Sequence, residues 1–452
     1  MKRDASPASD WTEFIGAHPD IRALDAFIID VNGHALGKRL PLADAPKAFS
    51  DGVQFSACAL VSDTRGLGHN VQGMGGSDGD PDATALPVRG TLCRAPWTHV
   101  PTAQVLCHMR DARERQSLWF DPRLILAKVV EQCRAAGIHP VVACELEFYL
   151  IDPRRTPEGG IQLAAPGAHA SPPRRAANLS LEAVETQAVF LSRVDQAAEA
   201  QGIPVCGSVA EYGIGQFEVN LHHVRDPLQA ADHAVLLQRL IKGVAQSLGM
   251  QATFMAKPFI DQPGSGLHVH VSIEDANGVN RFGSDGGEAL LQQAIAGMQA
   301  LMFDSVGLCA PNLNSHRRYL GPFVPTSHDW GHNNRSVAFR VPAAHGQARR
   351  VEHRVAGADA SPHLVVAAVL ASVLHGIGQG LSATSPVEGR VHKSEKQEFP
   401  VGLLAALART ESSALLARYI PERFLRLFVE LKQQEYAAAM ADIFPVEYDF
   451  YL

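Results

Sequence analysis

Five short segments of the chain alternate apolar residues with glutamate, histidine or arginine. They span residues 142–150, 215–221, 267–273, 337–341 and 350–355. Alternation with a period of two residues is typical of a β-strand with one packed face. An ordinary amphipathic sheet would carry Thr, Ser, Lys and Gln on its polar face, whereas these strands carry Glu, His and Arg. Because carboxylates on one face repel each other unless cations lie among them, the pattern predicts a divalent-metal site with arginines beside it.

Each segment taken alone has an ordinary explanation. Two alternating glutamates such as Glu145 and Glu147 more often lie on a solvated strand face. A pair such as His268-x-His270 is often structural, and a pair such as Arg349–Arg350 is usually on the surface. Together, five glutamates and one histidine supply about the ligands that two hard cations need. The arginines exceed what pairing with those carboxylates requires. They are Arg318, Arg335, Arg340, Arg350 and Arg354. Such an excess fits a polyphosphate, and phosphoryl chemistry is favoured over simple metal-assisted hydrolysis.

Composition excludes several other classes of protein. The 452 residues are 46% hydrophobic and 19% charged, which is typical of a globular protein with a large core. A net charge of −7 gives no basic field for nucleic acid, so no nucleic-acid partner is expected. The longest apolar run, 364–374, is too short to span a bilayer, and no membrane partner is expected. The seven cysteines include no C-x-x-C pair, and the first residues lack an apolar signal core, so we expect a cytoplasmic protein with reduced thiols.

The segments between these strands predict an α+β fold with a mainly antiparallel sheet and helices packed behind it. Residues 1–17 are expected to be a disordered leader, 18–112 a small amino-terminal domain and 113–452 a large catalytic domain. Residues 26–31 and 37–42 flank Asn32–Gly33 and predict a hairpin. Helices are expected near 122, at 181–201, 228–248, 288–303 and 362–377, and within 412–443.

Several motifs, in their order along the chain, resemble the glutamine synthetase family over residues 20–450. They are FIIDVNGHALGKRL at 27–40, GDPDATALPVRGTL at 79–92, ELEF at 145–148, AEYGIGQFEVN at 210–220, ATFMAKPFIDQPGSGLHVHVS at 252–272, NSHRRY at 314–319, NNRSVAFRVP at 333–342 and ARRVEHRVAGADASPHL at 348–364. The resemblance implies a β-grasp-like amino-terminal domain and a homo-oligomer, a hexamer or dodecamer, with active sites shared between neighbouring subunits.

The resemblance also implies two metal ions, Mg²⁺ or Mn²⁺, in each active site. The first would be held by Glu147, Glu211 and Glu218. The second would be held by Glu145, His268 and Glu352.

The remaining site residues are likewise implied by the resemblance, with ATP as co-substrate. Gly264, Arg318 and Arg354 match positions that orient the substrate glutamate. Arg335 and Arg340 match the catalytic pair that handles phosphate. The ATP contacts would be His270, Ser272, Arg335, Arg340 and Arg350. In the implied reaction, ATP phosphorylates the γ-carboxylate of glutamate, and an amine then attacks the acyl phosphate.

Departures from the family pattern bear on which amine reacts. Ammonium-using members carry a glutamate in the loop that here reads LGPFVPTSHDWGHNNR, and Phe323-Val324-Pro325 offers no carboxylate. The family's FDGSS-like stretch is replaced by FSAC at 55–58, and Pro263 stands where an Asn usually precedes GSGxH. Without two anionic groups, a caged ammonium site is disfavoured. The phrases GHNNR, VAGADASPHL and RYIPERF are most similar to the γ-glutamylputrescine (polyamine) synthetase branch of the family.

Three hypotheses remain open at this stage. The first is an ATP-dependent ligase that joins glutamate to a primary amine or polyamine. The second is a glutamine synthetase that uses ammonium, and the third is a structural or regulatory family member without catalysis. Under the first, Phe323, Val324 and Trp330 are expected to form an apolar wall for the amine, and either Asp63 or Asp329 would accept its proton.

Overall fold

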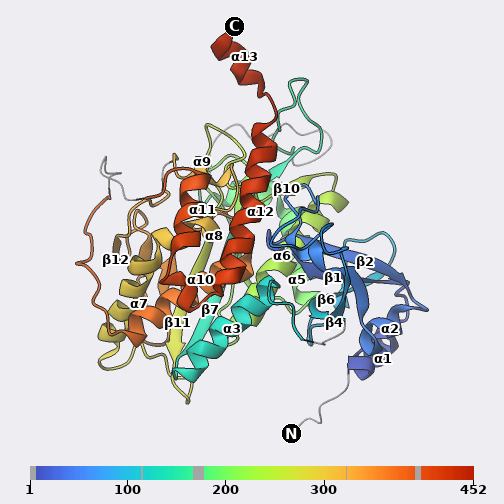
Figure 1. The fold of residues 1–452 in the computed structure, drawn as a ribbon, viewed down its shortest axis with the longest axis horizontal. Helices are drawn as coiled ribbons and strands as arrows, with labels where there is room; N and C mark the ends of the chain where they lie inside the picture. Colours follow the sequence, from blue (N-terminus) through green and yellow to red (C-terminus); the bar gives the residue numbers. More distant parts are fainter. Residues whose placement is uncertain (1–6, 113–115, 166–177, 322, 392–398) are drawn as a thin grey trace.

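The computed structural model describes residues 7–112, 116–165, 178–321, 323–391 and 399–452. Within them the chain builds two β-sheets and a set of helices that lie mostly around the larger sheet (Figure 1). The helices are α1 (Pro7–Ala17), α2 (Ala45–Ser50), α3 (Pro122–Ala135), α4 (Leu181–Thr186), α5 (Ala188–Ala200), α6 (Pro227–Ser247), α7 (Gly287–Leu301), α8 (Val306–Cys309), α9 (Ser315–Arg318), α10 (Pro362–Gly378), α11 (Leu403–Ser412), α12 (Glu422–Met440) and α13 (Pro445–Tyr451).

The smaller sheet forms before residue 112. Its strands run in the order β2 (Ala35–Pro41), β1 (Ala23–Ile29), β6 (Thr102–Asp111), β4 (Asp82–Pro87) and β3 (Val53–Ser56), and β5 (Cys93–Arg94) pairs with β6. The predicted hairpin is confirmed, because β1 and β2 pair antiparallel from Ala23–Pro41 to Ile29–Ala35. Every residue of β1 is buried, whereas β2 at the sheet edge is mostly exposed.

The larger sheet carries all five segments with charged faces. Its order is β12 (Trp330–His332), β13 (Phe339–Val341), β14 (Val351–His353), β11 (Leu267–Glu274), β7 (His139–Ile151), β9 (Gln216–Leu221) and β8 (Val205–Ala210), and β10 (Gln251–Thr253) pairs with β7. Every pairing is antiparallel except that of β12 with β13. The expected α+β fold with a mainly antiparallel sheet is therefore confirmed.

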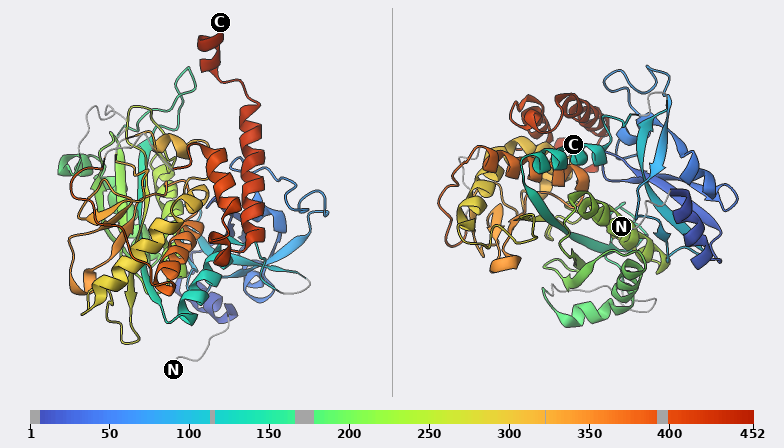
Figure 2. Two further views of the ribbon diagram at one scale, coloured as in Figure 1. Left: turned by 60° about the vertical axis from the view of Figure 1, so that its left-hand side comes forward. Right: turned by 90° about the horizontal axis from the view of Figure 1, so that it is seen from below.

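Helices cover one side of this sheet. α6 packs on β7 and β10, and α10 packs against α3, α6 and α7. All residues of α10 from Pro362 to Gly376 are buried, which explains the apolar run found in the sequence. Figures 1 and 2 show α11 and α12 outside this layer, and the terminal helix α13 projecting away from the body. Among the described residues, none of the helices combines the length and apolar character needed to cross a membrane.

The predicted disordered leader is wrong for residues 7–17, which form α1. The reason is packing: Trp11 is 6% exposed, and its ring stacks on that of Phe49 from α2, with centroids 5.4 Å apart. Burial of one large aromatic side chain is enough to fix a short helix that propensity alone would leave frayed. Residues 1–6 lie outside the described residues.

A buried lysine links the smaller sheet to two segments that follow it in the chain. Lys432 of α12 is fully buried, and its ammonium donates to Asn32 Oδ1 at 2.6 Å and Asn312 Oδ1 at 2.9 Å. It also lies 3.1 Å from Glu435 Oε2. Asn32 belongs to the β1–β2 turn and Asn312 to the segment before α9, so one ammonium ties three distant parts of the chain together.

We expect Lys432→Met to destabilise the protein by about 3 kcal/mol, because it leaves buried acceptors without a donor. Thermal unfolding measured by scanning calorimetry checks this. Lys47→Met is the control, since Lys47 pairs with Asp44 on the surface and its side chain is 71% exposed. A surface pair contributes less than about 1 kcal/mol. Equal melting temperatures for both variants would contradict the bridging role.

Candidate active site

Strand register brings the charged residues together on one face of the large sheet. β7 places Glu145 and Glu147 two residues apart and therefore on the same side. Glu147 pairs with Glu218 of β9, and Glu145 pairs with His268 of β11. Two residues further along β11, His270 pairs with Glu352 of β14. Directly opposed residues on neighbouring strands have side chains about 5 Å apart, so the register alone assembles the cluster.

The first predicted ligand set is brought together in the structure. Ligand atoms of Glu147, Glu211 and Glu218 lie within 4.8 Å of one another. Glu211 follows β8 directly, and Glu218 lies on the neighbouring strand β9. One oxygen of Glu218 accepts from Asn220 Nδ2 at 2.9 Å, and one oxygen of Glu147 accepts from the Gly266 amide at 2.6 Å. These bonds orient both carboxylates.

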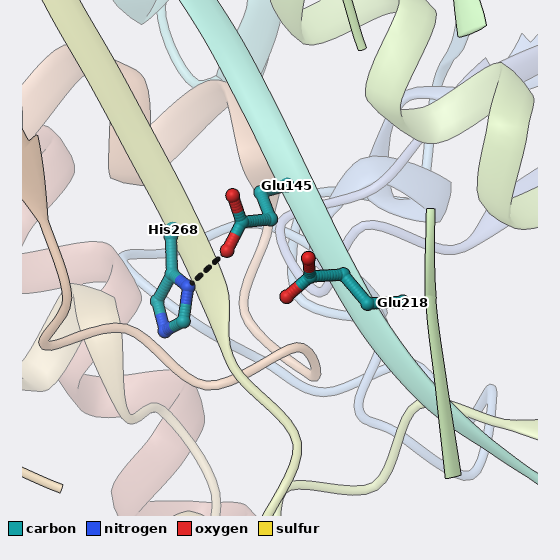
Figure 3. A group of neighbouring side chains, drawn as sticks. All are labelled: Glu145, Glu218 and His268. Atoms are coloured by element: carbon teal, nitrogen blue, oxygen red, sulfur yellow. Dashed lines mark hydrogen bonds and ion pairs between the residues drawn. The ribbon is translucent and has the colours of Figure 1, made fainter. Parts of the chain in front are cut away.

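The residues of the second predicted set fall into two overlapping groups: His268 lies with Glu145 and Glu218, whereas Glu352 lies with Glu145 and His270. Glu145 Oε1 lies 2.8 Å from His268 Nδ1, and His268 Nδ1 lies 3.8 Å from Glu352 Oε1. Figure 3 shows His268 turned toward Glu145, with Glu218 on the other side of Glu145. His270 forms a second three-residue group with Glu145 and Glu352, and its Nε2 lies 3.1 Å from Glu145 Oε2. Sequence alternation gives both histidines the same face, so it could not distinguish them.

The crowded charges shift the pKa values of neighbouring glutamates in opposite directions. Burial raises the pKa of Glu218, and the negative charges of Glu145 and Glu147 raise it further. Burial likewise raises the pKa of Glu211 to about 7, with Glu147 adding to the effect. Burial also acts on Glu145, but hydrogen bonds from His268 and His270 outweigh it and hold its pKa well below the usual range. The cluster therefore cannot hold all its carboxylates ionised without added positive charge.

The donor set fits two hard divalent cations. Each group offers three carboxylate or imidazole atoms, which are ligands that Mg²⁺ and Mn²⁺ accept. Gly266 keeps the site open at one corner, because a Cβ there would lie 2.7 Å from His268 Nε2 and 2.8 Å from Arg318 Nη2.

Arginines surround the acidic cluster. Arg340 Nη1 lies 2.7 Å from Glu352 Oε2, Arg354 also pairs with Glu352, and Arg350 Nε donates to His270 Nδ1 at 3.2 Å. The Nε atoms of Arg318, Arg340 and Arg354 are buried and have no hydrogen-bond partner among the described residues. Unpaired guanidinium donors of this kind suit an anionic ligand.

The predicted glutamate-binding residues lie next to one another. Arg318 Nη1 donates to Val355 O at 2.9 Å, and its Nη2 lies 3.5 Å from Arg354 O. A Cβ on Gly264 would lie 2.6 Å from Arg318 Cγ, so only glycine permits this approach. The Gly264 carbonyl accepts from Gln216 Nε2 at 3.1 Å, which connects it to β9.

A cavity of about 630 Å³ opens beside the cluster. Its lining includes the predicted residues Glu145, Glu211, Glu218, His270, Arg335, Arg340 and Arg350. Ser272, a predicted ATP contact, is not among the described residues that line it, although it lies two positions beyond His270 on β11. Cys206, His222 and His223 also line the cavity and were not predicted, because no alternation or spacing marks them.

The predicted apolar wall is wrong for Trp330, which is buried in the core and whose Nε1 donates to the Thr384 carbonyl at 2.6 Å. Val324 is largely buried, but it lines a small cavity together with Phe323. Phe323 is exposed, and its ring stacks on Tyr212, a residue that the sequence did not single out. Composition cannot show whether an apolar residue in a loop points into the core or into a site.

The two proposed proton acceptors are both engaged. Asp63 has a fully buried carboxylate that accepts from the Arg65 and Leu67 amides, both at 2.9 Å, and from the Arg65 guanidinium. Its Oδ2 also lies 2.9 Å from His69 Nε2. It therefore holds the 63–69 loop together. Asp329 Oδ2 accepts from Ser327 Oγ at 2.5 Å.

Comparison with known proteins gives consistent matches. Residues 120–451 match the family model described as the glutamine synthetase catalytic domain. The chain is 38% identical over 439 residues to gamma-glutamylputrescine synthetase of Escherichia coli K12, covering 96% of this chain and 92% of that protein. It is 31% identical over 437 residues to glutamate–isopropylamine ligase of a Pseudomonas species, with 94% and 93% covered. A solved structure described as a GmaS/ADP complex has the same fold, with a TM-score of 0.83 at 23% identity and 97% and 98% of the two chains covered.

We expect Glu211→Gln to raise the melting temperature in metal-free buffer, by about 1 kcal/mol of stability, because it removes one repelling carboxylate. The variant is also expected to lose most of the stabilisation that Mg²⁺ or Mn²⁺ gives the unaltered protein. Thermal shift with and without each metal measures both effects. Exposed Glu158 provides the control Glu158→Gln. An unchanged metal response in Glu211→Gln would contradict the assignment of the first cluster.

Proposed function

The chain belongs to the glutamine synthetase family, and we propose that it is an ATP-dependent ligase that joins the γ-carboxylate of glutamate to a primary amine. The observation that carries the proposal is the acidic clusters on one sheet face, with arginines beside them whose Nε atoms have no hydrogen-bond partner among the described residues. This arrangement suits transfer of a phosphoryl group between two anions, which would otherwise repel each other.

The proposed reaction needs two steps because a carboxylate cannot expel oxide. ATP phosphorylates the glutamate γ-carboxylate, and the amine nitrogen then forms the amide bond as phosphate leaves and the amine loses a proton. We assign one cation to Glu147, Glu211 and Glu218, and the other to Glu145, His268 and Glu352. Divalent cations held there would neutralise phosphate oxygens during transfer. Mg²⁺ and Mn²⁺ both suit the donor set.

The roles of the other residues follow their placement. Arg318 and Arg354 with Gly264 would hold glutamate, since they form one group next to the first cluster. Arg335 and Arg340 line the large cavity and would stabilise the transferring phosphoryl group. His270 and Arg350 would contact ATP, and we assign Ser272 to its periphery.

A primary alkyl amine is the acceptor that the loop favours. Phe323 and Val324 offer no carboxylate to cage ammonium, and the relatives at 38% and 31% identity are named for putrescine and isopropylamine. A putrescine-like diamine or polyamine is therefore our first candidate. A glutamine synthetase using ammonium is disfavoured by the same loop. A family member without catalysis is disfavoured because all six assigned ligands are present in the sequence, and repelling carboxylates have no structural use.

We further propose a homo-oligomer of hexamer or dodecamer type. The terminal helix α13 supports this, since Tyr448, Phe450 and Tyr451 are exposed on an element that projects from the body. A cytoplasmic location is supported by seven cysteines that are all free, six of them buried. We place the domain boundary at residue 112, where the small sheet ends.

The direct test is phosphate release with glutamate, ATP and a panel of ammonium, putrescine, spermidine, ethanolamine and aromatic amines. Each buried CH₂ contributes about 0.8 kcal/mol, so a four-carbon amine should gain about 3 kcal/mol over ammonium, roughly a hundredfold in kcat/KM. The control omits glutamate, which separates ligase turnover from ATP hydrolysis. Preference for ammonium over every larger amine would replace this proposal with the glutamine synthetase alternative.

A further inference from the structure

Two stacked aromatic rings join the acidic cluster to the loop of residues 323–334, named here the acceptor loop. The ring centroids of Tyr212 and Phe323 are 4.9 Å apart, and the planes are inclined by 26°. Tyr212 is 47% exposed and Phe323 is 49% exposed, so the pair does not belong to the core. Tyr212 directly follows Glu211 of the first cluster, which places the rings at the edge of the candidate active site.

The acceptor loop is held in an unusual backbone conformation at this point. Phe323 has φ of 65° and Asn333 has φ of 47°, both in the left-handed region that residues other than glycine rarely adopt. Such strain persists only where surrounding contacts hold it, and it is concentrated at functional sites. Here the contacts are the Tyr212 ring for Phe323 and the Arg340 guanidinium, which donates to Asn333 Oδ1 at 3.0 Å. Both anchors belong to the site.

The stacked pair lies between two chambers. Tyr212 lines the 630 Å³ cavity of the cluster, together with Arg335. Phe323 lines a second cavity of about 280 Å³ along the acceptor loop, together with Ser336. Arg335 and Ser336 are consecutive, so each cavity also has a lining residue next to one that lines the other. The second cavity is named here the tail chamber.

The tail chamber has the lining that a carbon chain requires. Val324 and Pro325 supply apolar surface, and hydroxyl groups are present on Ser327 and Ser336. At the ~30 Å³ that one water occupies in the liquid, its volume has room for several methylene groups. Among its described lining residues, Arg390 is the charged side chain.

We propose that the Tyr212–Phe323 pair is the partition that selects the acceptor amine: its nitrogen reacts on the cluster side, and its carbon tail passes the rings into the tail chamber. This inference rests on the proposed ligase function and narrows its substrate class to aliphatic primary amines with a tail of several carbons. Ammonium and methylamine would leave the tail chamber unused. The two rings are specificity-determining residues and take no part in proton or phosphoryl transfer.

The test compares kcat/KM for methylamine, n-butylamine and putrescine in the unaltered enzyme and in Tyr212→Ala, Phe323→Ala and Tyr212→Phe. We expect each alanine variant to lower the butylamine-to-methylamine ratio by about tenfold, because ring contacts with the chain are lost. Tyr212→Phe retains a ring and should keep the ratio. KM for ATP and for glutamate should change much less than KM for butylamine, and melting temperatures report on folding.

Arg390→Ala provides a second arm, because butylamine and putrescine differ at the far end of the chain. If the tail ends beside Arg390, removal of the guanidinium should raise kcat/KM for putrescine relative to butylamine several-fold. An unchanged butylamine-to-methylamine ratio in both alanine variants, or an equal loss of kcat/KM for all three amines, would overturn the partition while leaving the ligase intact. Absence of glutamate-dependent phosphate release with every amine in the unaltered enzyme would instead remove the proposed function itself.

Discussion

Repulsion among carboxylates on one sheet face is the constraint on which the rest of the site depends. Glu145, Glu147 and Glu218 lie on adjacent strands with their charges directed to the same side, and Glu211 joins them from the end of β8. The pKa values of two of these glutamates shift in opposite directions. Two histidines lower the pKa of Glu145, whereas burial and the charges of Glu145 and Glu147 raise the pKa of Glu218. A folded chain keeps such a cluster only where bound cations offset the repulsion during function. The positive charges of the surrounding guanidinium groups would likewise offset the negative charge of an anionic substrate.

Burial of the apolar side of the same strands stabilises the sheet against repulsion among the carboxylates. Leu146, Phe148, Val219 and Val269 are buried between the sheet and its helices. A slip of one residue in any pairing would turn those side chains toward the cavity and the carboxylates into the core. The register that builds the ligand sets is therefore enforced by hydrophobic burial behind them, at about 25 cal/mol for each Å² removed from water. The predicted ligand positions are therefore set by a sheet whose opposite face is buried.

The sequence predicted this part well because both faces of each strand leave a signal with a period of two. The five strands needed only alternation, and the grouping of Glu147, Glu211 and Glu218 needed only a family resemblance in addition. Other features depended on contacts that alternation does not encode. His268 and His270 share a face, and both contact Glu145, so their different strand neighbours follow only from the register that pairs His268 with Glu145 and His270 with Glu352. The core position of Trp330 and the helix at residues 7–17 are decided by tertiary packing over long sequence separations. The loop role of Asp63 depends on contacts with residues 65–69. Tyr212 left no signal, because a lone tyrosine after a glutamate has no period.

The division between sheet and loop also explains how related ligases can differ in their amine while sharing one phosphoryl chemistry. Strands position most of the predicted metal ligands, whereas the exposed part of the acceptor loop, such as Phe323, can change without disturbing the sheet. The loop is not independent, however. Asn333 holds it to Arg340, which also pairs with Glu352 of the second cluster. Under the proposed roles, a change in the acceptor loop would therefore act on two quantities at once: the space offered to the amine and the orientation of Arg340. Selection of the amine and stabilisation of the phosphoryl group would be coupled through this one guanidinium, so we expect a substitution that only enlarges the tail chamber to keep turnover when it preserves the Asn333–Arg340 bond.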